Sequence, residues 1–300
     1  MKEFKEAMFY ERLEEEKVEC TLCPHYCKVA PGKTGICGVR QNIDGQLVSL
    51  IYAKASSIAV DPIEKKPLCH FHPGSKVLSL GSYGCNMKCG FCQNWRIAHK
   101  NFARDQGLVY EEVSPERVVQ MAKETGSQGI AWTYNEPTIW FEYTFDSAIL
   151  AKKAGLYTVY VTNGYITEPA LDKIGPYLDA YSVDLKSFSN EFYQKVCKIK
   201  DFMPVLTAIE RARKKWQMHV EITTLLIPTK NDSEAELKQI ADWIVKHVGL
   251  ETPWHVSRFI PYLEFSHLLP TPEATLIKAK EIGQKAGLKY VHIGNVPGLT

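Results

Sequence analysis

The strongest constraint in this 300-residue sequence is a regular alternation of strand-like and helix-like segments that begins at residue 76. Runs rich in Val, Ile and Tyr predict strands at 76–82, 129–134, 156–163, 180–187, 219–228, 254–261 and 289–296. The intervening segments predict helices at 114–125, in the stretch that ends at residue 154, after Pro169, and at 189–215, 233–248 and 271–287. A capping box from Ser233 to Glu236 is expected at the start of the helix at 233–248. Such alternation is typical of a parallel sheet with helical crossovers. We therefore expect an α/β protein, a partial or full (β/α) barrel of parallel strands with about six units.

The first 75 residues do not follow this alternation. Residues 1–18 are strongly charged and predict a helix, whereas residues 19–75 are rich in turn formers, with one expected strand at 47–54. We expect an N-terminal helix and a Cys-rich, loop-rich metal-binding segment over 1–75, followed by the barrel core over 76–300.

The overall charge and hydropathy exclude several classes of protein. The chain has 36 basic and 34 acidic residues, so its net charge of +2 gives no electrostatic reason to expect nucleic acid as the main partner. The charged start lacks the apolar core of a secretory leader, and no apolar run approaches the ~18 residues of a membrane span. We expect a cytoplasmic protein, in which clustered thiols stay reduced and indicate metal binding or catalysis.

Three of the nine cysteines form a tight group in "GCNMKCGFCQNW", where Cys85, Cys89 and Cys92 have the spacing C-x3-C-x2-C. A structural zinc site closes with four ligands, but three thiolates can hold three corners of a [4Fe–4S] cluster. One iron then stays open to an exchangeable ligand, such as the amino and carboxylate groups of a methionine. We therefore interpret this cysteine triplet as the ligand set of a catalytic [4Fe–4S] cluster.

The main alternative is a zinc knuckle made by Cys89 and Cys92. Its remaining ligands would come from His70, His72 or His99. Such a site would make the chain a zinc-binding interaction module without redox chemistry.

Polar or turn-forming residues follow each of the predicted strands. After the triplet come "YNEP", "TNGY", "DLK", "IPTKND" and "RFIPY", one behind each successive strand. In parallel sheets and barrels, ligands bind at the carboxyl ends of the strands, which meet at one edge. We expect these segments to line one pocket.

At these residues the chain resembles the radical S-adenosylmethionine superfamily, whose signature is C-x3-C-x2-C with an aromatic residue, here Phe91, before the last cysteine. Such enzymes carry a Gly-Gly-Glu-Pro segment where this chain has "TYNEP". The resemblance implies that Asn135 and Glu136 bind the ammonium of the methionine moiety, although Tyr134 and Asn135 replace the two glycines.

The next two segments extend the resemblance. Thr162 and Asn163 in "VTNGY" match a cofactor-lining strand, and "VDLK" resembles the Asp-x-Lys segment of pyruvate formate-lyase activating enzymes. This implies that Lys186, helped by Asn163, pairs with the methionine carboxylate, and that Asp184 orients Lys186 or holds a cation. Without the resemblance, Asp184 and Lys186 are a simple ion pair on one face of a strand.

Two residues in "HVSRFIP", His255 and Arg258, are implied to touch the adenosine or the substrate. Arg258 has the alternative of pairing with Glu221 at the edge of the core. Glu136 likewise has an alternative, as an acid that stabilises a helix N-terminus.

The resemblance implies an enzyme that reductively cleaves S-adenosylmethionine at a [4Fe–4S] cluster, with an electron from a donor such as ferredoxin or flavodoxin. The 5′-deoxyadenosyl radical would take a hydrogen atom from a substrate that the resemblance does not name. Over nearly the whole chain, "CTLCPHYCKVAPGKTGICGVR", "AWTYNEPTIWFEY" and "YVHIGNVPGLT" resemble the radical enzyme of the AmmeMemoRadiSam family. That family implies Memo-type and Ammecr-type proteins as partners, and its members usually continue past "GNVPG" into a tail with another cysteine pair.

Four further cysteines, Cys20, Cys23, Cys27 and Cys37, have the spacing C-x2-C-x3-C-x9-C. Four thiolates in one loop-rich segment can close a zinc site or hold a second [4Fe–4S] cluster that relays electrons. Both remain open from the residues, and His25 is interpreted as a bystander.

The last two cysteines stand apart from these sets. Cys69 begins C-H-x-H, and in an extended segment its two histidines would face away from it, so we interpret Cys69 as a buried thiol and His72 as a turn residue. Cys197 is interpreted as a small apolar residue, or as a hydrogen-atom donor if it faces the pocket.

Besides a radical enzyme acting on a small molecule and the zinc-binding interaction module, the sequence leaves two hypotheses open. One is an activase for a glycyl-radical enzyme. The other is an electron carrier that uses both cysteine sets, although such carriers normally close each cluster with four cysteines.

Overall fold

An open eight-stranded sheet forms the centre of the protein. The computed structural model describes residues 4–296 and 298. Seven strands are parallel: β9 (Lys76–Gly81), β11 (Gly129–Trp132), β12 (Tyr157–Thr162), β13 (Ala180–Asp184), β14 (His219–Leu226), β15 (Trp254–Arg258) and β16 (Val291–Gly294). β8 (Ser57–Pro62) adds an antiparallel edge beside β9, and the order is β16-β15-β14-β13-β12-β11-β9-β8. The two edges do not pair, so the predicted α/β barrel is a partial one.

The helices follow the predicted alternation. They are α1 (Trp95–Ala98), α2 (Pro115–Glu124), α3 (Phe141–Lys153), α4 (Glu168–Ile174), α5 (Asn190–Phe192), α6 (Met203–Lys214), α7 (Glu234–His247) and α8 (Glu273–Ala286). The hydroxyl of Ser114 caps α2 by accepting from the N–H of Arg117, and Ser233 caps α7 by accepting from the N–H of Glu236. None of the helices in the described residues has the length and apolar character that a bilayer span requires.

Two local expectations about helices are wrong. The helix expected at 189–215 is divided into α5, a π-helical turn η4 (Tyr193–Cys197) and α6, because Lys198 has a left-handed φ of 62° that ends the first part. The capping box expected at Ser233 is only half formed. The Glu236 carboxylate accepts hydrogen bonds from Ser187 and from the N–H of Phe188 instead of returning to the cap.

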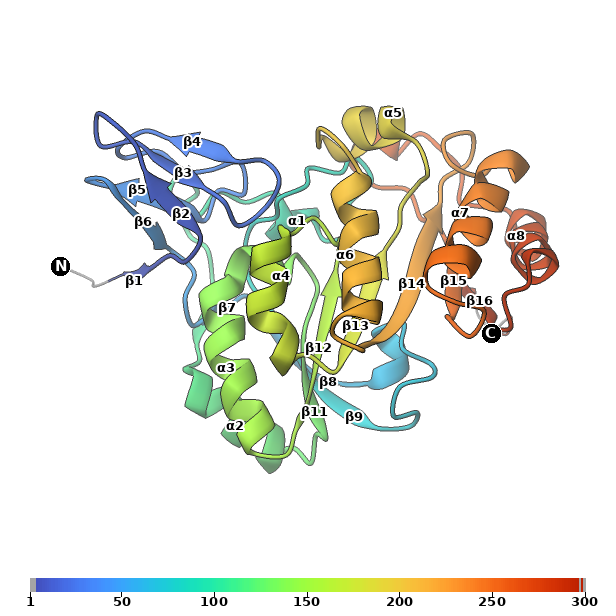
Figure 1. Ribbon diagram of the computed structural model, residues 1–300, viewed down its shortest axis with the longest axis horizontal. Coiled ribbons are helices and arrows are strands. Elements are labelled where there is room, and N and C mark those ends of the chain that lie inside the picture. Colours follow the sequence, from blue (N-terminus) through green and yellow to red (C-terminus); the bar gives the residue numbers. More distant parts are fainter. Residues whose placement is uncertain (1–3, 297, 299–300) are drawn as a thin grey trace.

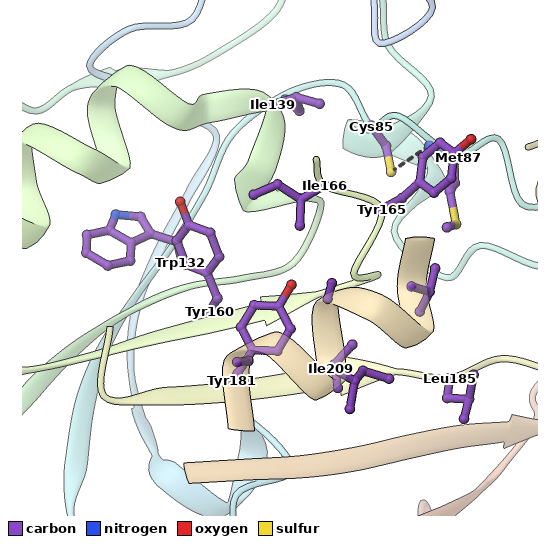
Figure 2. Packing of buried hydrophobic residues seen from close by; sticks show 14 of the residues in the cluster. Cys85, Met87, Trp132, Ile139, Tyr160, Tyr165, Ile166, Tyr181, Leu185 and Ile209 are labelled. Carbon is purple, nitrogen blue, oxygen red and sulfur yellow. Dashed lines mark hydrogen bonds between the residues drawn. The ribbon is translucent and has the colours of Figure 1, made fainter. Parts of the chain in front are cut away.

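The two faces of the sheet differ because side chains alternate along each strand. Trp132, Tyr160 and Tyr181 are neighbours on three adjacent strands and point toward the helical layer, where Ile209 of α6 also lies (Figure 2). The opposite, inner face carries a smaller apolar cluster: Ile63, Leu68, Val77, Ala131, Tyr157, Val159 and Ala180. The first two of these come from the segment between β8 and β9, which therefore closes the amino end of the inner face.

The N-terminal residues form strands, and the helix expected over 1–18 is wrong for residues 4–18. The strands are β1 (Lys5–Glu6), β2 (Tyr10–Arg12), β3 (Val18–Cys20), β4 (Cys27–Val29), β5 (Arg40–Ile43) and β6 (Gln46–Ser49); β7 (Lys54–Ala55) pairs with β10 (Glu111–Glu112). Left-handed φ values at Glu15 and Glu16 form the turn between β2 and β3. The expected strand at 47–54 shortens to β6. These strands and α8 lie at opposite ends of the molecule (Figure 1).

Candidate active site

A cavity of about 530 Å³ opens at the carboxyl ends of the parallel strands. Its lining includes nine residues singled out from the sequence: Cys85, Cys89, Cys92, Asn135, Glu136, Thr162, Asn163, Asp184 and Lys186. The prediction that successive strand ends share one pocket is confirmed for these residues. A cavity of this size can hold a ligand as large as a nucleoside.

The loop that carries the cysteine triplet is held tightly from two sides. Gly84 has φ 85°, and a Cβ there would lie 2.6 Å from the carbonyl oxygen of Cys37. A Cβ on Gly90 would lie 2.9 Å from the Glu264 carboxylate, and the Gly90 N–H donates to Val196. Glycine is therefore required where the N-terminal segment and a later loop approach the triplet.

The three thiols face the cavity from a largely apolar setting. Cys85 and Cys89 are buried and Cys92 is half-buried. Burial raises the pKa of all three thiols, and that of Cys92 reaches about 11; for Cys89 a hydrogen bond with Cys197 is the larger cause. The Cys85 sulfur accepts weak hydrogen bonds from the N–H of Met87 (3.3 Å; Figure 2) and from the Asn163 amide (3.6 Å). A bound metal is what would turn such thiols into thiolates.

Glu136 is 1% exposed and receives three hydrogen bonds from its own chain. One carboxylate oxygen accepts from the N–H of Thr138 (2.9 Å) and the hydroxyl of Thr162 (2.7 Å), and the other accepts from the N–H of Asn163 (2.8 Å). Burial raises the pKa of Glu136, and these bonds oppose the rise. Glu136 caps the short helix η2 (Pro137–Trp140), as its alternative interpretation expected, and also presents a carboxylate to the cavity.

The segment before Glu136 keeps the backbone shape that glycine would favour. Tyr134, which replaces the first glycine of the resembled motif, has a left-handed φ of 70°. Its hydroxyl donates to Asp61 over 2.8 Å, which helps hold that conformation. The Asn135 amide accepts from the N–H of Ser82 and donates to the carbonyl of Gly84, so Asn135 ties this segment to the cysteine loop.

Asp184 and Lys186 form an ion pair of 2.6 Å at the mouth of the cavity. The Lys186 side chain is only 12% exposed, and Asp184 is 43% exposed. Burial lowers the pKa of Lys186, but the charges of Asp184 and the nearby thiols outweigh burial and raise it. The ammonium also lies 5.8 Å from the Phe91 ring centroid, which places a fixed positive charge beside the triplet.

The structure does not bring His255 and Arg258 to this cavity. The His255 ring contacts Glu221 over 2.6 Å, one pleat nearer the amino end than Ser257, which does line the cavity. Arg258 lies 4.0 Å from Glu273 at the outside. Both were expected to touch the adenosine or the substrate, but neither lines the cavity, because the His255 ring turns to Glu221 and the Arg258 side chain turns to Glu273.

Several lining residues were missed from the sequence. Thr223 and Ser257 lie on β14 and β15, and Asn295, Lys65 and Lys66 also line the cavity. The Thr223 hydroxyl is buried and has no hydrogen-bond partner among the described residues, so it is available to a ligand. Side chains two positions apart on a strand share a face, so Thr223 lies on the same face of β14 as Glu221 and, by the strand pairing, beside Asp184 of β13. This alternation is the signal that could have identified Thr223.

The match to known proteins decides the family. Residues 80–244, more than half of the chain, match the radical SAM superfamily. The chain belongs to the radical SAM superfamily. It is 42% identical over 294 residues to an uncharacterized protein of Methanocaldococcus jannaschii, covering 98% of this chain and 86% of that relative. A putative glycyl-radical enzyme activating enzyme of the same organism is 26% identical over 213 residues, or 70% of this chain and 78% of the relative.

A solved radical SAM methyltransferase from Sphaerobacter thermophilus shares the fold. Its TM-score is 0.56 at 18% identity, over 76% of this chain and 69% of that chain. At this identity the likeness supports the partial-barrel fold alone.

Membership of the radical SAM superfamily implies catalysis with a [4Fe–4S] cluster and S-adenosylmethionine, and the residues present fit both groups. Among the described residues, three ligand atoms come within 4.8 Å of one another only at Cys69, Glu221 and His255. The sulfurs of the triplet are thus spread wider than the about 3.8 Å that a tetrahedral zinc site with ~2.3 Å bonds requires. The free Thr223 hydroxyl and the Glu136 carboxylate supply polar partners for a ligand beside them.

The other four clustered cysteines of this radical SAM protein surround a second, apolar cavity. Cys20, Cys23, Cys27 and Cys37 line it together with His25 and Arg40, among others. The Arg40 guanidinium is buried, pairs with Glu142 over 2.9 Å, and has an Nε without a partner among the described residues. His25, expected to be a bystander, contacts the carbonyl of Asn86 over 2.6 Å and so links this cavity to the residue after Cys85.

Proposed function

We propose that this radical SAM protein cleaves S-adenosylmethionine reductively to start hydrogen-atom abstraction from a substrate. The observation that carries the proposal is the meeting of three thiols and the Glu136 carboxylate in one cavity at the strand ends. A [4Fe–4S] cluster on Cys85, Cys89 and Cys92 would, when loaded, supply one electron to the sulfonium and so yield methionine and a 5′-deoxyadenosyl radical.

The residues around the triplet position the cofactor and exclude water. Glu136 has one oxygen that accepts only a single hydrogen bond, so that oxygen can accept one more from the methionine ammonium. The Lys186 ammonium pairs with the methionine carboxylate, and Asp184 orients it. Thr162 and Asn163 hold the Glu136 carboxylate in place, and Asn135 holds the cysteine loop.

The sequence likeness to activating enzymes supports a second candidate substrate. The substrate would then be a glycyl-radical enzyme and not a small molecule, in keeping with the relative that is 26% identical. The likeness to the AmmeMemoRadiSam family supports Memo-type and Ammecr-type partners instead. In either case a ferredoxin or flavodoxin supplies the electron, and the nine unpaired thiols favour a reducing compartment, the cytoplasm.

We propose that the N-terminal cysteines hold a second metal centre, either zinc or a [4Fe–4S] cluster that relays electrons. Burial of Cys23 and Cys37 raises the pKa of both thiols, so a cation must stabilise the thiolates, and Arg40 adds a positive charge beside them. No three of the four sulfurs lie within 4.8 Å of one another among the described residues, a spread that favours a cluster over a single ion. The contact from His25 to Asn86 provides a short route toward Cys85.

Anaerobic reconstitution with iron and sulfide tests the main proposal. After reduction with dithionite and addition of S-adenosylmethionine, we expect 5′-deoxyadenosine. A reduced, iron-loaded protein that forms none would overturn the proposal, and a colourless protein that takes up only zinc would support the interaction-module alternative.

Metal content tests the second centre. If it is a cluster, replacing Cys20 and Cys23 by serine lowers iron from roughly eight to roughly four per chain. If it is zinc, the variant loses one zinc and keeps its iron. Unchanged iron and zinc contents would contradict both forms of the proposal.

A further inference from the structure

The inner face of the sheet is apolar at the amino end of some strands and polar at the amino end of others. Under β9 to β13 this end is closed by the apolar cluster of Ile63, Leu68 and their neighbours. Under β14, β15 and β16 it carries Glu221, His255 and His292 instead. None of these three side chains lines the cavity at the other end. They therefore form a separate group that the proposed function does not use.

Cys69 joins two members of this group, so that three side chains from three separate segments converge. Cys69, from the segment between β8 and β9, Glu221 and His255 each place a ligand atom within 4.8 Å of the other two. Glu221 is 0% and His255 4% exposed, and the His255 Nε2 lies 2.6 Å from the Glu221 carboxylate. The same carboxylate accepts from the N–H groups of Cys69 (3.1 Å) and His70 (2.8 Å), which fixes Cys69 beside it.

We propose that Cys69, Glu221 and His255 bind a zinc ion. A thiolate, an imidazole and a carboxylate are all zinc ligands, with bonds of about 2.0–2.3 Å, so small side-chain rotations bring the three atoms into range. The charges balance, since one thiolate and one carboxylate neutralise the ion at a site where Glu221 and His255 are buried. Binding releases the thiol proton of Cys69, and His255 stays a neutral imidazole because its proton moves from Nε2, which then binds the ion, to Nδ1.

Two further imidazoles adjoin this triad. The His292 ring stacks on His255 with centroids 5.1 Å apart, and the Nε2 atoms of His70 and His292 lie 2.8 Å apart. A water or one of these rings can supply the fourth ligand that a tetrahedral zinc ion requires. The ion would fasten the segment between β8 and β9 to β14 and β15.

The competing explanation is a purely structural carboxylate. Glu221 also contacts His219 Nε2 over 2.9 Å, so its hydrogen-bonding capacity is filled without any metal. The two explanations differ in the state of the Cys69 thiol. A purely structural Glu221 leaves the thiol free to react, whereas a zinc ion binds the sulfur and protects it.

Alkylation of Cys69 in the iron-loaded, full-length protein distinguishes the zinc site from a purely structural carboxylate. Peptide mass spectrometry reports this thiol alone, so metal at the other cysteines does not interfere. With free zinc at ten times the dissociation constant, we expect Cys69 to react about tenfold more slowly than in chelator, because the free fraction falls by that factor. An unchanged rate overturns the proposal. The result does not depend on S-adenosylmethionine cleavage, so this proposal and the proposed function fail separately.

Variants give a second measurement. Cys69→Ser and His255→Gln keep hydrogen-bonding groups of similar size, and each should lose one zinc per chain. His219→Gln is the matched control, because His219 contacts the same carboxylate but lies outside the triad. Equal zinc in the wild type and both triad variants contradicts the site. If a variant does not fold, the alkylation of the wild type still decides.

Discussion

The carboxylate of Glu136 accepts a 2.8 Å hydrogen bond from the backbone N–H of Asn163. The two residues follow β11 and β12, which are adjacent parallel strands, so the bond joins two strand ends across the rim of the cavity. It fixes the direction of the buried carboxylate and replaces part of the hydration that the carboxylate loses on burial. Asn163 also contacts the triplet, because its side-chain amide donates to the Cys85 sulfur.

Glu136→Gln should weaken binding of S-adenosylmethionine by about 10- to 100-fold, since a hydrogen bond to a charged group contributes roughly 1.5–3 kcal/mol. Anaerobic calorimetry of the iron-loaded protein measures this directly. Glu168→Gln, on the exposed start of α4, is the control and should bind normally. Wild-type affinity in Glu136→Gln would remove Glu136 from the binding site.

Cys89→Ser should lose the triplet's cluster, whereas Cys197→Ser should keep it. The two thiols are hydrogen-bonded neighbours, and Cys197 is fully buried, but Cys197 does not line the cavity. Iron content and the electron paramagnetic resonance change on adding S-adenosylmethionine report the outcome. Loss of the cluster in Cys197→Ser would make Cys197 a fourth ligand and would contradict the open iron position.

Gly84→Ala should destabilise the fold by about 2–4 kcal/mol. The left-handed conformation costs a non-glycine residue about 1 kcal/mol, and the added Cβ would overlap Val39 and the Cys37 carbonyl, which costs about 1–3 kcal/mol more. Gly107→Ala is the matched control, because Gly107 has a φ of 69° and nothing within 4 Å of an added Cβ. Urea unfolding measures both. Equal losses would show that the overlap does not matter.

Asp61→Asn should cost about 3–5 kcal/mol at neutral pH, because it leaves the buried Lys66 ammonium unpaired. Burial raises the pKa of Asp61, but hydrogen bonds from Lys65, Lys66 and Tyr134 outweigh it and lower the pKa well below its ordinary value. A carboxylate whose pKa is lower in the folded state stabilises the fold above its unfolded pKa of ~3.9. That stability is lost as the pH falls toward the folded value.

The difference between wild type and Asp61→Asn should therefore shrink below pH ~4. Chemical unfolding across a pH series measures it. Asp242→Asn, which breaks an exposed pair with Lys238, is the control and should cost less than about 0.5 kcal/mol at any pH. A difference that stays constant with pH would mean that Asp61 is not held ionised by its partners.

The sequence determined the seven parallel strands and most of the cavity, but not the antiparallel edge strand β8. Alternating segments from residue 76 specify parallel strands, and parallel strands necessarily bring Glu136, Thr162 and Lys186 to one edge. The hydroxyl caps at Ser114 and Ser233 were equally predictable, because each involves residues three positions apart. The triplet is also a local feature, with its three thiols on a single loop.

Only the tertiary structure decided the remaining features. Charged residues 4–18 form strands because β3 and β6 offer pairing partners, which helix propensity cannot anticipate. His255 does not line the cavity although its register partner Thr223 does, because its ring turns to the buried Glu221 carboxylate, one pleat nearer the amino end. Cys69 and Glu221 meet across 152 residues of sequence through a backbone hydrogen bond. Such contacts depend on strand register and packing, which link segments whose local patterns carry no information about each other.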